Sequence, residues 1–404
     1  MTDDANQHEV LSIHHGGAVG GAPTSLALQA GIVTRQGRTR LTIAAHRPEI
    51  HAFFERHGQT VRGWPDPLVL LGKVCIGWTV LRTRRQWSSF LRETLLLPLS
   101  VWRQWDALRR SSATVVHLNS AVLLSSAIAA RLAGKPVVWH VREASTPPRC
   151  LRRFMRGLAT RMVCISPVEA EVYGSRHPKV RVVYNPVDFA RFDPDRHDRV
   201  EARRQLGIPT DARVAISLGG VVPRKGAKEI AEAIAELDND LYAIIAGPAL
   251  KPDGGPYHDR VAEALGVAQD RVIFTGPVDD PARLLAASDL LIFAGTSPHF
   301  PRPVYEAWAM RLPVVVFDVR GVSENVDHDV DGWIVSPRTG PRLAEALRQA
   351  WRASARFDDM GLRGREKALD RTGCENSGAA LEAILHDAAT TRPCGDTAQK
   401  GSTA

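Results

Sequence analysis

The chain has 404 residues, 44% of them apolar and 24% charged, with a formal net charge of +8. This is ordinary globular composition, long enough for two α/β domains of about 150–200 residues each. The positive balance favours contact with phosphates, nucleotides or an anionic membrane surface. The five cysteines are far apart and form no C-x-x-C pair, which argues against a zinc site or a disulfide framework and fits a reducing cytosol.

The ends and hydropathy of the sequence predict a cytoplasmic protein. The first ten residues, MTDDANQHEV, are polar and acidic, unlike a signal peptide. Uninterrupted apolar runs never approach the length of about 18 residues that a membrane-spanning helix needs.

Short apolar, β-branched runs alternate with longer helical patterns, which is typical of βαβ units and a parallel sheet. Between two strand-like runs, residues 121–134 predict a helix with a polar start at Asn119-Ser120 and Gly134 just past its end. The strand-like runs of the first half are 9–15, 39–45, 113–119, 135–141, 161–166 and 181–185.

The alternation restarts after a polar connector that spans 189–212. A helix at 228–237 would place Ile230, Ile234 and Leu237 on one face. Residues 341–387 look helical and are candidates to pack back across the domain boundary, and the tail from 388 is predicted to be disordered. The strand-like runs of the second half are 213–220, 241–247, 271–276, 291–296, 313–319 and 332–336.

Open parallel sheets bind ligands at the carboxyl ends of their strands. The first strand ends in His14-His15 and leads into a glycine-rich loop that begins GGAVGG at residue 16. Glycines let the backbone approach a phosphate or sugar, and Pro23-Thr24 suits a helix start whose free N–H groups bind anions. A tight turn without a ligand explains the loop equally well.

The fourth strand ends in WHVRE at 139–143. Side chains alternate along a strand, so His140 and Arg142 would share one side and could face a reacting sugar. A hydrogen-bonded core histidine is the alternative interpretation, and for an isolated histidine it is the one favoured.

In the second half of the sequence, a glycine-rich turn contains two cationic residues and a proline-rich turn precedes a glutamate. Arg224 and Lys225 lie in SLGGVVPRKGAKEI (217–230) and could neutralise a pyrophosphate leaving group, unless they are simply solvated. In GTSPHFPRPVYEAWAM (295–310), Pro303 suits the first helical position, so Glu306 would lie in the first turn. That carboxylate could accept both hydroxyls of a ribose, or could only pair with the helix dipole.

These segments together resemble the retaining GT-B glycosyltransferases. Four of them match in order: GGAPTSL after the first strand, the strand ending in His140, the VVYNPVDFARF hinge (182–192), and VVPRKG followed by TSPHFPRPVYEAWAMRLPVVVFDVRGVSENVDHDVDGWIVSP (296–337). The last is the most specific. The resemblance covers about residues 9–370 and implies two Rossmann-like domains that face a cleft: an acceptor domain at 1–190, a connector at 191–212 and a nucleotide-sugar domain at 213–340.

The resemblance also implies a reaction and its residues. An acceptor hydroxyl would attack the anomeric carbon on the face that the phosphate leaves, and the phosphate would take the proton, so positioning and charge stabilisation suffice. Such enzymes usually need no bound metal, and the D-x-D pairs at 193–195 and 329–331 are discounted. His140 would contact the transferred sugar, Lys225 the pyrophosphate and Glu306 the ribose. The remaining donor-binding candidates are Gly20, Gly21, Arg224, Phe300, Arg302 and Val304.

Three departures from the family pattern stand out. The first glutamate of its paired motif is replaced by Pro298, followed by His299, and its phosphate-binding arginine aligns with Gly220. Pro301 and Pro303 remove two backbone donors. We expect Arg302, with Arg224, to replace the missing cation, because a guanidinium binds phosphate bidentately. A plain surface arginine is the alternative for Arg302.

Residues 72–110 are the least typical segment. Trp78, Trp87, Trp102 and Trp105 are interleaved with leucines and arginines, as in an interfacial amphipathic helix. We hypothesise docking on the inner face of an anionic membrane near a glycan or lipid-linked acceptor. The alternative is that these apolar residues pack inside the first domain.

The sequence thus predicts a glycosyltransferase of cell-envelope glycan, glycolipid or polysaccharide synthesis, with a nucleotide sugar as donor, no cofactor and no nucleic-acid partner. A non-catalytic subunit of the same fold is the main alternative, motivated by Pro298 and Gly220. An epimerase with a GT-B-like fold is a further alternative, but the absence of the first glutamate of the paired motif gives it no support. A nicotinamide dehydrogenase would need a G-x-G-x-x-G with a following ribose acid, which the sequence lacks.

Overall fold

The computed structural model divides the chain into two compact units. The first unit comprises 1–186 together with 374–404, and the second comprises 187–373. The chain passes from one unit to the other twice, after residue 186 and after residue 373. Within the second unit, the residues beside these two points are joined, because the Val187 N–H donates to the carbonyl of Thr372 at 2.9 Å. The structure describes residues 7–15, 21–77, 80–81, 83–144, 146–237, 241–248 and 255–391.

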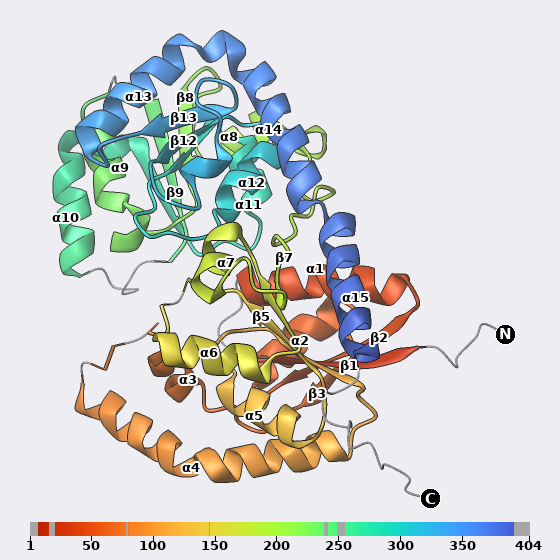
Figure 1. The fold of residues 1–404 in the computed structure, drawn as a ribbon. Helices are drawn as coiled ribbons and strands as arrows, with labels where there is room; N and C mark the ends of the chain where they lie inside the picture. Colours follow the sequence, from red (N-terminus) through yellow and green to blue (C-terminus); the bar gives the residue numbers. More distant parts are fainter. Residues whose placement is uncertain are drawn as a thin grey trace, which may run out of the picture. The chain divides into compact units, whose positions relative to one another are not determined.

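The first unit contains a seven-stranded parallel sheet in the order β3-β2-β1-β4-β5-β6-β7 (Figure 1). The strand order reverses between β1 and β4, because β2 and β3 are added on one side of β1 and the strands from β4 to β7 on its other side. Its strands are β1 (His8–His14), β2 (Thr39–Ala45), β3 (Val61–Gly63), β4 (Val115–Leu118), β5 (Val137–Val141), β6 (Arg161–Cys164) and β7 (Val180–Val182).

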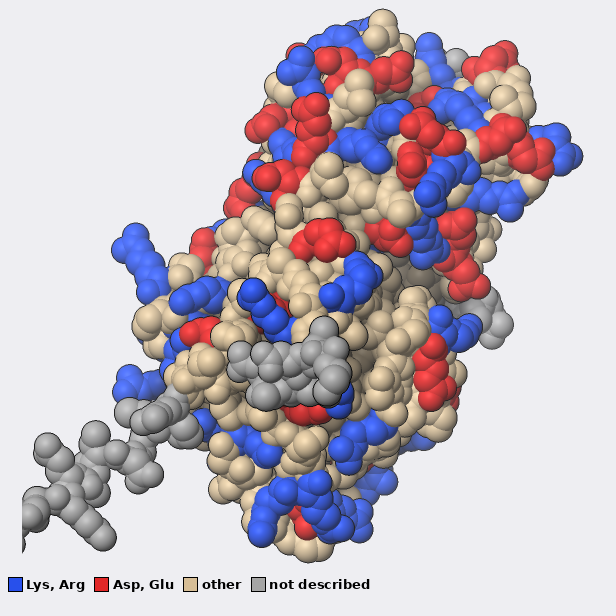
Figure 2. Space-filling model, turned by 90° about the vertical axis from the view of Figure 1, so that its right-hand side faces the viewer, with Lys and Arg blue, Asp and Glu red and all other residues tan. Residues whose placement is uncertain are grey.

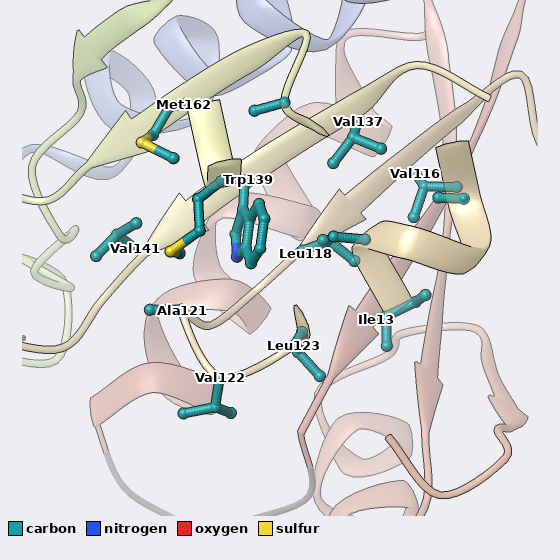
Figure 3. Packing of buried hydrophobic residues seen from close by; sticks show 14 of the residues in the cluster. Ile13, Val116, Leu118, Ala121, Val122, Leu123, Val137, Trp139, Val141 and Met162 are labelled. Carbon is teal, nitrogen blue, oxygen red and sulfur yellow. The ribbon is translucent and has the colours of Figure 1, made fainter. Parts of the chain in front are cut away.

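Helices cover both faces of this sheet, and each face has its own apolar core. One core surrounds Trp139 of β5, with Val116 and Leu118 from β4; Figure 3 shows these side chains together with Val122 and Leu123. The opposite core contains Val10, Val115 and Val138. The helices are α1 (Gly21–Arg35), α2 (Pro48–Arg56), α3 (Val69–Cys75), α4 (Arg84–Arg109), α5 (Leu124–Leu132), α6 (Arg149–Leu158), α7 (Pro167–Tyr173) and α15 (Cys374–Thr390).

Helix α15 belongs to the first unit, although it is the last helix of the chain. Leu381, Leu385 and Ala388 are fully buried in the core that also contains Val10. The boundary at 388 for a disordered tail is therefore wrong, since the helix continues to Thr390. Residues 392–404 of that predicted tail lie outside the described residues.

The second unit contains a six-stranded parallel sheet in the order β10-β9-β8-β11-β12-β13, which reverses between β8 and β11. Its strands are β8 (Arg213–Ser217), β9 (Leu241–Ala246), β10 (Val272–Gly276), β11 (Leu290–Phe293), β12 (Val314–Phe317) and β13 (Gly332–Val335). Its α-helices are α8 (Arg199–Gln205), α9 (Ala227–Ala235), α10 (Pro256–Leu265), α11 (Pro281–Ala286), α12 (Arg302–Ala309), α13 (Gly340–Arg352) and α14 (Phe357–Thr372).

The predicted connector at 191–212 is an integral part of the second unit. It contains α8, whose Arg203 side chain is 1% exposed. The Arg203 guanidinium donates to the carbonyls of Ala287, Thr210 and Ala212 and pairs with Asp289 at 3.1 Å. A run rich in arginine and aspartate looks solvated in sequence, but here these charges pair with each other and with buried main-chain oxygens.

The α/β fold with two parallel sheets is confirmed, because each predicted strand-like run overlaps an observed strand. Most observed strands end before the predicted run does, since the residues that follow form loops. Strand β3 was not predicted, because the sequence of this strand, VRG, contains a single apolar residue and does not form an apolar run.

Gly378 offers a test of the packing of α15. A Cβ at this position would lie 2.4 Å from Cβ of Ile32 in α1. We expect Gly378→Ala to lower the free energy of unfolding by about 1–3 kcal/mol because the core would be overpacked. Urea denaturation followed by circular dichroism measures this change.

Gly157 of α6 is the matched control, because a Cβ there has no heavy atom within 4 Å. Alanine favours a helix over glycine, so Gly157→Ala should be neutral or stabilising by up to about 1 kcal/mol. Equal stability of the Gly378→Ala protein and the unmodified chain would contradict the packing of α15 on α1.

Candidate functional site

The loops that follow β8 and β11 meet at the reversal point of the second sheet. In open parallel sheets, ligands bind where the strand order reverses, at the carboxyl ends of the strands. The main-chain N–H of Thr296 donates to the carbonyl of Arg224 at 3.1 Å, which joins the two loops directly. The candidate donor-binding residues that the sequence predicts in these two loops therefore lie close together.

The loop after β8 is shaped by two glycines that a side chain would disrupt. A Cβ at Gly219 would lie 2.9 Å from Cβ of Lys225, so the missing side chain makes room for the lysine stem. Gly220 has φ of +66°, and a Cβ there would lie 2.1 Å from the carbonyl oxygen of Pro248. An arginine cannot be accommodated at position 220 in this backbone, which explains why this cation of the family pattern is missing.

Lys225 lies in a half-buried pocket between the two loops. Its ammonium is 5.4 Å from the centre of the Phe293 ring and 3.4 Å from Nε2 of His299. Burial, with a smaller effect from the charge of Arg224, lowers the pKa of Lys225 to about 8. Burial and the charge of Lys225 lower the pKa of His299 to about 4, so this imidazole is neutral near pH 7.

His299 is oriented by its other ring nitrogen. Nδ1 lies 2.6 Å from the carbonyl oxygen of Ser297, so this nitrogen carries the proton and Nε2 accepts from Lys225. The histidine that follows Pro298 therefore contacts a cation of the candidate site, which its position in the sequence alone did not reveal.

Arg302 and Glu306 form an ion pair at the start of α12. Nε of Arg302 donates to Oε1 of Glu306 at 2.8 Å, and both side chains are mostly buried. The helix begins at Arg302, so Pro303 occupies the second position and Glu306 lies beyond the first turn. The predicted register was one residue off, because proline is equally acceptable at either of the first two positions.

Phe300 and Val304 support this helix start from inside. The Phe300 ring stacks on Tyr305 at 5.0 Å and is buried, and the Val304 side chain is fully buried. The Val304 N–H donates to the carbonyl of Pro301 at 2.9 Å. The side chains of both predicted donor-binding residues thus pack inside the helix start, and the charged side chains at this edge include Arg224, Lys225, Arg302 and Glu306.

A second polar cluster lies at the reversal point of the first sheet. The lateral register of β1, β4 and β5 places His14, Asn119 and His140 side by side. All three side chains are fully buried. The cluster lies on the face covered by α1 and α15, because Gln29 of α1 bonds both Arg142 and Ser377.

Arg142 is the centre of this cluster. Its guanidinium donates to the side-chain oxygens of Asn119, Asn185 and Gln29, and lies 3.4 Å from Nδ1 of His140. The structure thus brings His140 and Arg142 together, as their spacing predicted. Gly21 begins α1, whereas Gly20 lies outside the described residues.

Sequence reasoning missed Asn119 and His117 as members of the cluster and named His14 only as a strand end. Asn119 was interpreted as the start of a helix, yet α5 begins at Leu124 and the Asn119 side chain contacts His14 at 3.0 Å. A signal was present: His14, Asn119 and His140 lie at the carboxyl ends of β1, β4 and β5 in equivalent register, and strand order would have placed them together.

The segment predicted to bind a membrane contains the long helix α4. Trp105 packs partly against the core, but a row of large apolar side chains on another side is exposed. Trp78 and Arg82 of this segment lie outside the described residues. The exposed residues are Trp87, Leu91, Leu95, Leu96, Leu99 and Trp102.

The D-x-D pairs make structural contacts. Asp195 pairs with Arg311 at 2.9 Å, Asp329 pairs with Arg356 at 3.1 Å, and Asp331 pairs with Lys367. Across the described ranges, no group of three or more histidine, cysteine, aspartate or glutamate side chains has the arrangement of a metal site.

A cavity of about 180 Å³ opens at the other edge of the second sheet. It is lined by Leu237, Leu241, Trp351 and several arginines, including Arg213. Arg213 and Leu241 begin their strands, so this cavity lies at the amino ends, away from the loops that hold Lys225 and Glu306.

Two family models match the chain. Residues 30–191 match the model described as Glycosyltransferase Family 4, and residues 198–367 match Glycosyl transferases group 1. Together they cover most of both units.

Curated relatives match parts of the chain. It is 30% identical over 161 residues to the teichuronic acid biosynthesis glycosyltransferase TuaC of Bacillus subtilis (strain 168), covering 40% of this chain and 39% of that protein. It is 30% identical over 237 residues to D-inositol 3-phosphate glycosyltransferase 2 of Catenulispora acidiphila, covering 55% of each. The chain thus spans about half or less of the length of these relatives.

Solved structures match the fold over nearly the whole chain. Anabaena Alr3699/HepE, crystallised in complex with UDP and glucose, has a TM-score of 0.75 at 21% identity, covering 94% of this chain and 99% of that one. A glycosyltransferase from Rickettsia africae ESF-5 has a TM-score of 0.79 at 16% identity, covering 96% and 100%.

If the diphosphate of UDP binds at Lys225, the lowered pKa of this lysine predicts how binding depends on pH. The protonated ammonium binds diphosphate, and a bound anion raises its pKa above the free value of about 8. Affinity should therefore decline by about twofold from pH 7 to 8 and then more steeply, by up to about tenfold per pH unit. Isothermal titration calorimetry with UDP from pH 7 to 9 measures it.

Lys225→Arg is the control, because a guanidinium stays charged over this range. Its UDP affinity should not show the decline above pH 8. The same decline in both proteins would mean that another group titrates.

Proposed function

Because the chain belongs to the family of glycosyl transferases group 1 and glycosyltransferase family 4, with the GT-B fold, we propose that it transfers a sugar from a nucleotide-sugar donor to an acceptor hydroxyl with retention of anomeric configuration. The observation that carries this proposal is the edge formed by the loops after β8 and β11. Lys225 and Arg224 supply cations there, and Glu306 supplies a carboxylate.

The donor would lie with its diphosphate against Lys225 and its ribose against Glu306. Glu306 is held by Arg302 at 2.8 Å, so its second oxygen and the Arg302 fork can meet ribose and phosphate side by side. Nε2 of His299 contacts the Lys225 ammonium, and because this imidazole is neutral it adds no negative charge beside the lysine. The UDP bound by Alr3699/HepE supports a nucleotide of this class.

The reaction needs one bond exchange. The acceptor oxygen bonds the anomeric carbon on the face from which the phosphate oxygen departs, and the hydroxyl proton moves to that departing oxygen. Lys225, Arg224 and Arg302 stabilise the negative charge that develops on the diphosphate. As the family resemblance implies, His140 would contact the transferred sugar.

These cations also lead us to propose that transfer needs no resident metal ion. A guanidinium and an ammonium stabilise a diphosphate leaving group as a divalent cation does in other transferases.

We place the reaction in the synthesis of a cell-envelope glycan, glycolipid or polysaccharide. The matched relatives support this class of product: one acts in teichuronic acid biosynthesis, and the others are D-inositol 3-phosphate glycosyltransferases.

Arg302→Ala tests the donor site. Loss of a charge-assisted hydrogen bond to phosphate should lower kcat/KM for donor hydrolysis by about 10- to 100-fold. A thermal-shift screen of UDP and other nucleotide sugars first identifies the donor, and release of nucleotide then measures turnover, with and without EDTA.

Arg342→Ala is the matched control, because Arg342 pairs only locally with Glu345 on the exposed side of α13. Unchanged turnover in Arg302→Ala would remove Arg302 from the site. Donor binding without any hydrolysis would favour a non-catalytic subunit, and loss of turnover in EDTA would exclude the metal-independent mechanism.

The exposed row on α4 supports docking on an anionic membrane. Trp87, Leu91, Leu95 and Leu99 are four residues apart, so they lie along one side of the helix. Arg85, Arg92 and Arg103 are interleaved with the row. The helix's two acidic residues are engaged: Glu93 accepts from the N–H of Leu71, and Asp106 pairs with Arg110.

Surface charge agrees with this proposal. Figure 2 shows mostly basic charged side chains in the lower part of the face it presents, and both basic and acidic side chains in its upper part. Within the described residues no helix is long and apolar enough to span a bilayer, so α4 would lie in the interface.

Flotation with liposomes tests this surface. The chain should float with phosphatidylglycerol vesicles at low salt and not with phosphatidylcholine vesicles. Leu95→Glu should weaken binding by about tenfold or more, because Leu95 would lose burial in the interface and an acidic group would face anionic lipid.

Val267→Glu is the control, since Val267 is 99% exposed in the second unit. It should float like the unmodified chain. Failure of the unmodified chain to bind anionic vesicles would exclude the membrane as the partner of α4.

A further inference from the structure

Two buried imidazole nitrogens at the reversal point of the first sheet have no hydrogen-bond partner among the described residues. They are Nε2 of His14, at the end of β1, and Nε2 of His140, in β5. Both side chains are fully buried. An unsatisfied buried polar group is costly, and such groups gather where a ligand completes the site.

The tautomer of His14 is set by Asn119. The side-chain oxygen of Asn119 accepts from Nε of Arg142, so its amide nitrogen faces His14 and donates to Nδ1 at 3.0 Å. A neutral imidazole that accepts at Nδ1 carries its proton on Nε2. The unpartnered atom of His14 is therefore an N–H donor.

The tautomer of His140 is set in the same way by Arg142. A guanidinium can only donate, and Nη2 of Arg142 lies 3.4 Å from Nδ1 of His140. Nε2 of His117 lies 3.3 Å from the same atom, and Nδ1 of His117 contacts the hydroxyl of Ser12 at 2.8 Å. His140 therefore also presents an N–H at Nε2.

The electrostatic surroundings of these donors favour a negative ligand. Burial, and then the charges around them, lower the pKa of both His14 and His140 well below the usual range, and Arg142 contributes in each case. The charge of Lys73 acts on the adjacent His15. The carboxylate of Glu143, which follows Arg142 in the chain, accepts from the hydroxyl of Ser120 and from the N–H groups of Ala121 and Arg142.

We propose that His14 and His140 bind the oxygens of an anionic group, a phosphate or a carboxylate, on one of the two glycosyl substrates, with Arg142 as the residue that positions both donors. The resemblance implies a sugar contact for His140 alone, whereas this site adds His14 and defines the charge of its ligand. The inference rests on the proposed function, since it assigns a substrate group to the same reaction.

Binding of inorganic phosphate and D-glucuronate to the full chain tests the site by isothermal titration calorimetry. Replacing His14 by phenylalanine removes the donor, whereas glutamine retains an N–H₂ group near Nε2. We expect His14→Phe to weaken both anions by about 10- to 100-fold and His14→Gln by less than about fivefold, as for a hydrogen bond to a charged group. UDP affinity should be unchanged in both variants, because its site lies in the second unit.

Two further binding experiments identify whether the anionic group belongs to the acceptor or to the donor. If the anion belongs to the acceptor, glucuronate or phosphate binds together with saturating UDP-glucose. If it belongs to the donor, UDP-glucuronate binds more tightly than UDP-glucose, and His14→Phe removes the difference.

Imidazole nitrogen NMR reports on Arg142. His14 and His140 should show the Nε2–H tautomer in the unmodified chain and a mixture in Arg142→Gln. Absence of anion binding, equal loss in both His14 variants, or an Nδ1–H tautomer in the unmodified chain would each overturn the inference. If the nucleotide sugar identified by the thermal-shift screen binds normally in that case, the proposed function stands without this inference, whereas failure to bind every nucleotide sugar in the screen rejects the proposed function itself.

Discussion

The reversal of strand order in each parallel sheet determines where chemistry can occur in this protein. Between β1 and β4, and again between β8 and β11, the connecting loops leave in opposite directions, so the carboxyl ends of the two strands are not covered by a crossover. His14 and Asn119 flank the first of these points, and Lys225 and His299 flank the second. Residues far apart in sequence meet at these two points because β1 is adjacent to β4 in the first sheet and β8 is adjacent to β11 in the second.

Backbone conformation then decides which side chains the second site can use. The left-handed Gly220, packed against Pro248, leaves no space for a cation, while the bare Gly219 lets Lys225 fold inward over Phe293. Positive charge at this edge therefore comes from Lys225, in the loop after β8, and from Arg302 at the start of α12. Arg302 and Glu306 hold each other through one ion pair, which fixes the positions of both groups that we propose to bind the donor.

Much of this arrangement was predictable from sequence, and the exceptions have physical causes. Buried parallel strands are apolar runs, so all but the short β3 were visible, and the fold followed from their alternation with helices. The buried Arg203 was missed because burial of an arginine depends on main-chain acceptors such as Ala287 that lie far away in sequence. Asn119 was missed because an asparagine after a strand has the same signature whether it caps a helix or joins a polar cluster.

The two sites differ in how their charges are prepared. In the first unit, Arg142 is surrounded by amide oxygens and imidazoles that fix its position, so its donors are oriented before any ligand arrives. In the second unit, Lys225 is only half-buried and its pKa of about 8 lies close to neutrality, so the diphosphate that we propose to bind there would favour its protonated form. Donors that are already in place stabilise a developing negative charge without reorganisation. The Arg302–Glu306 ion pair gives the second unit one such prearranged group beside Lys225.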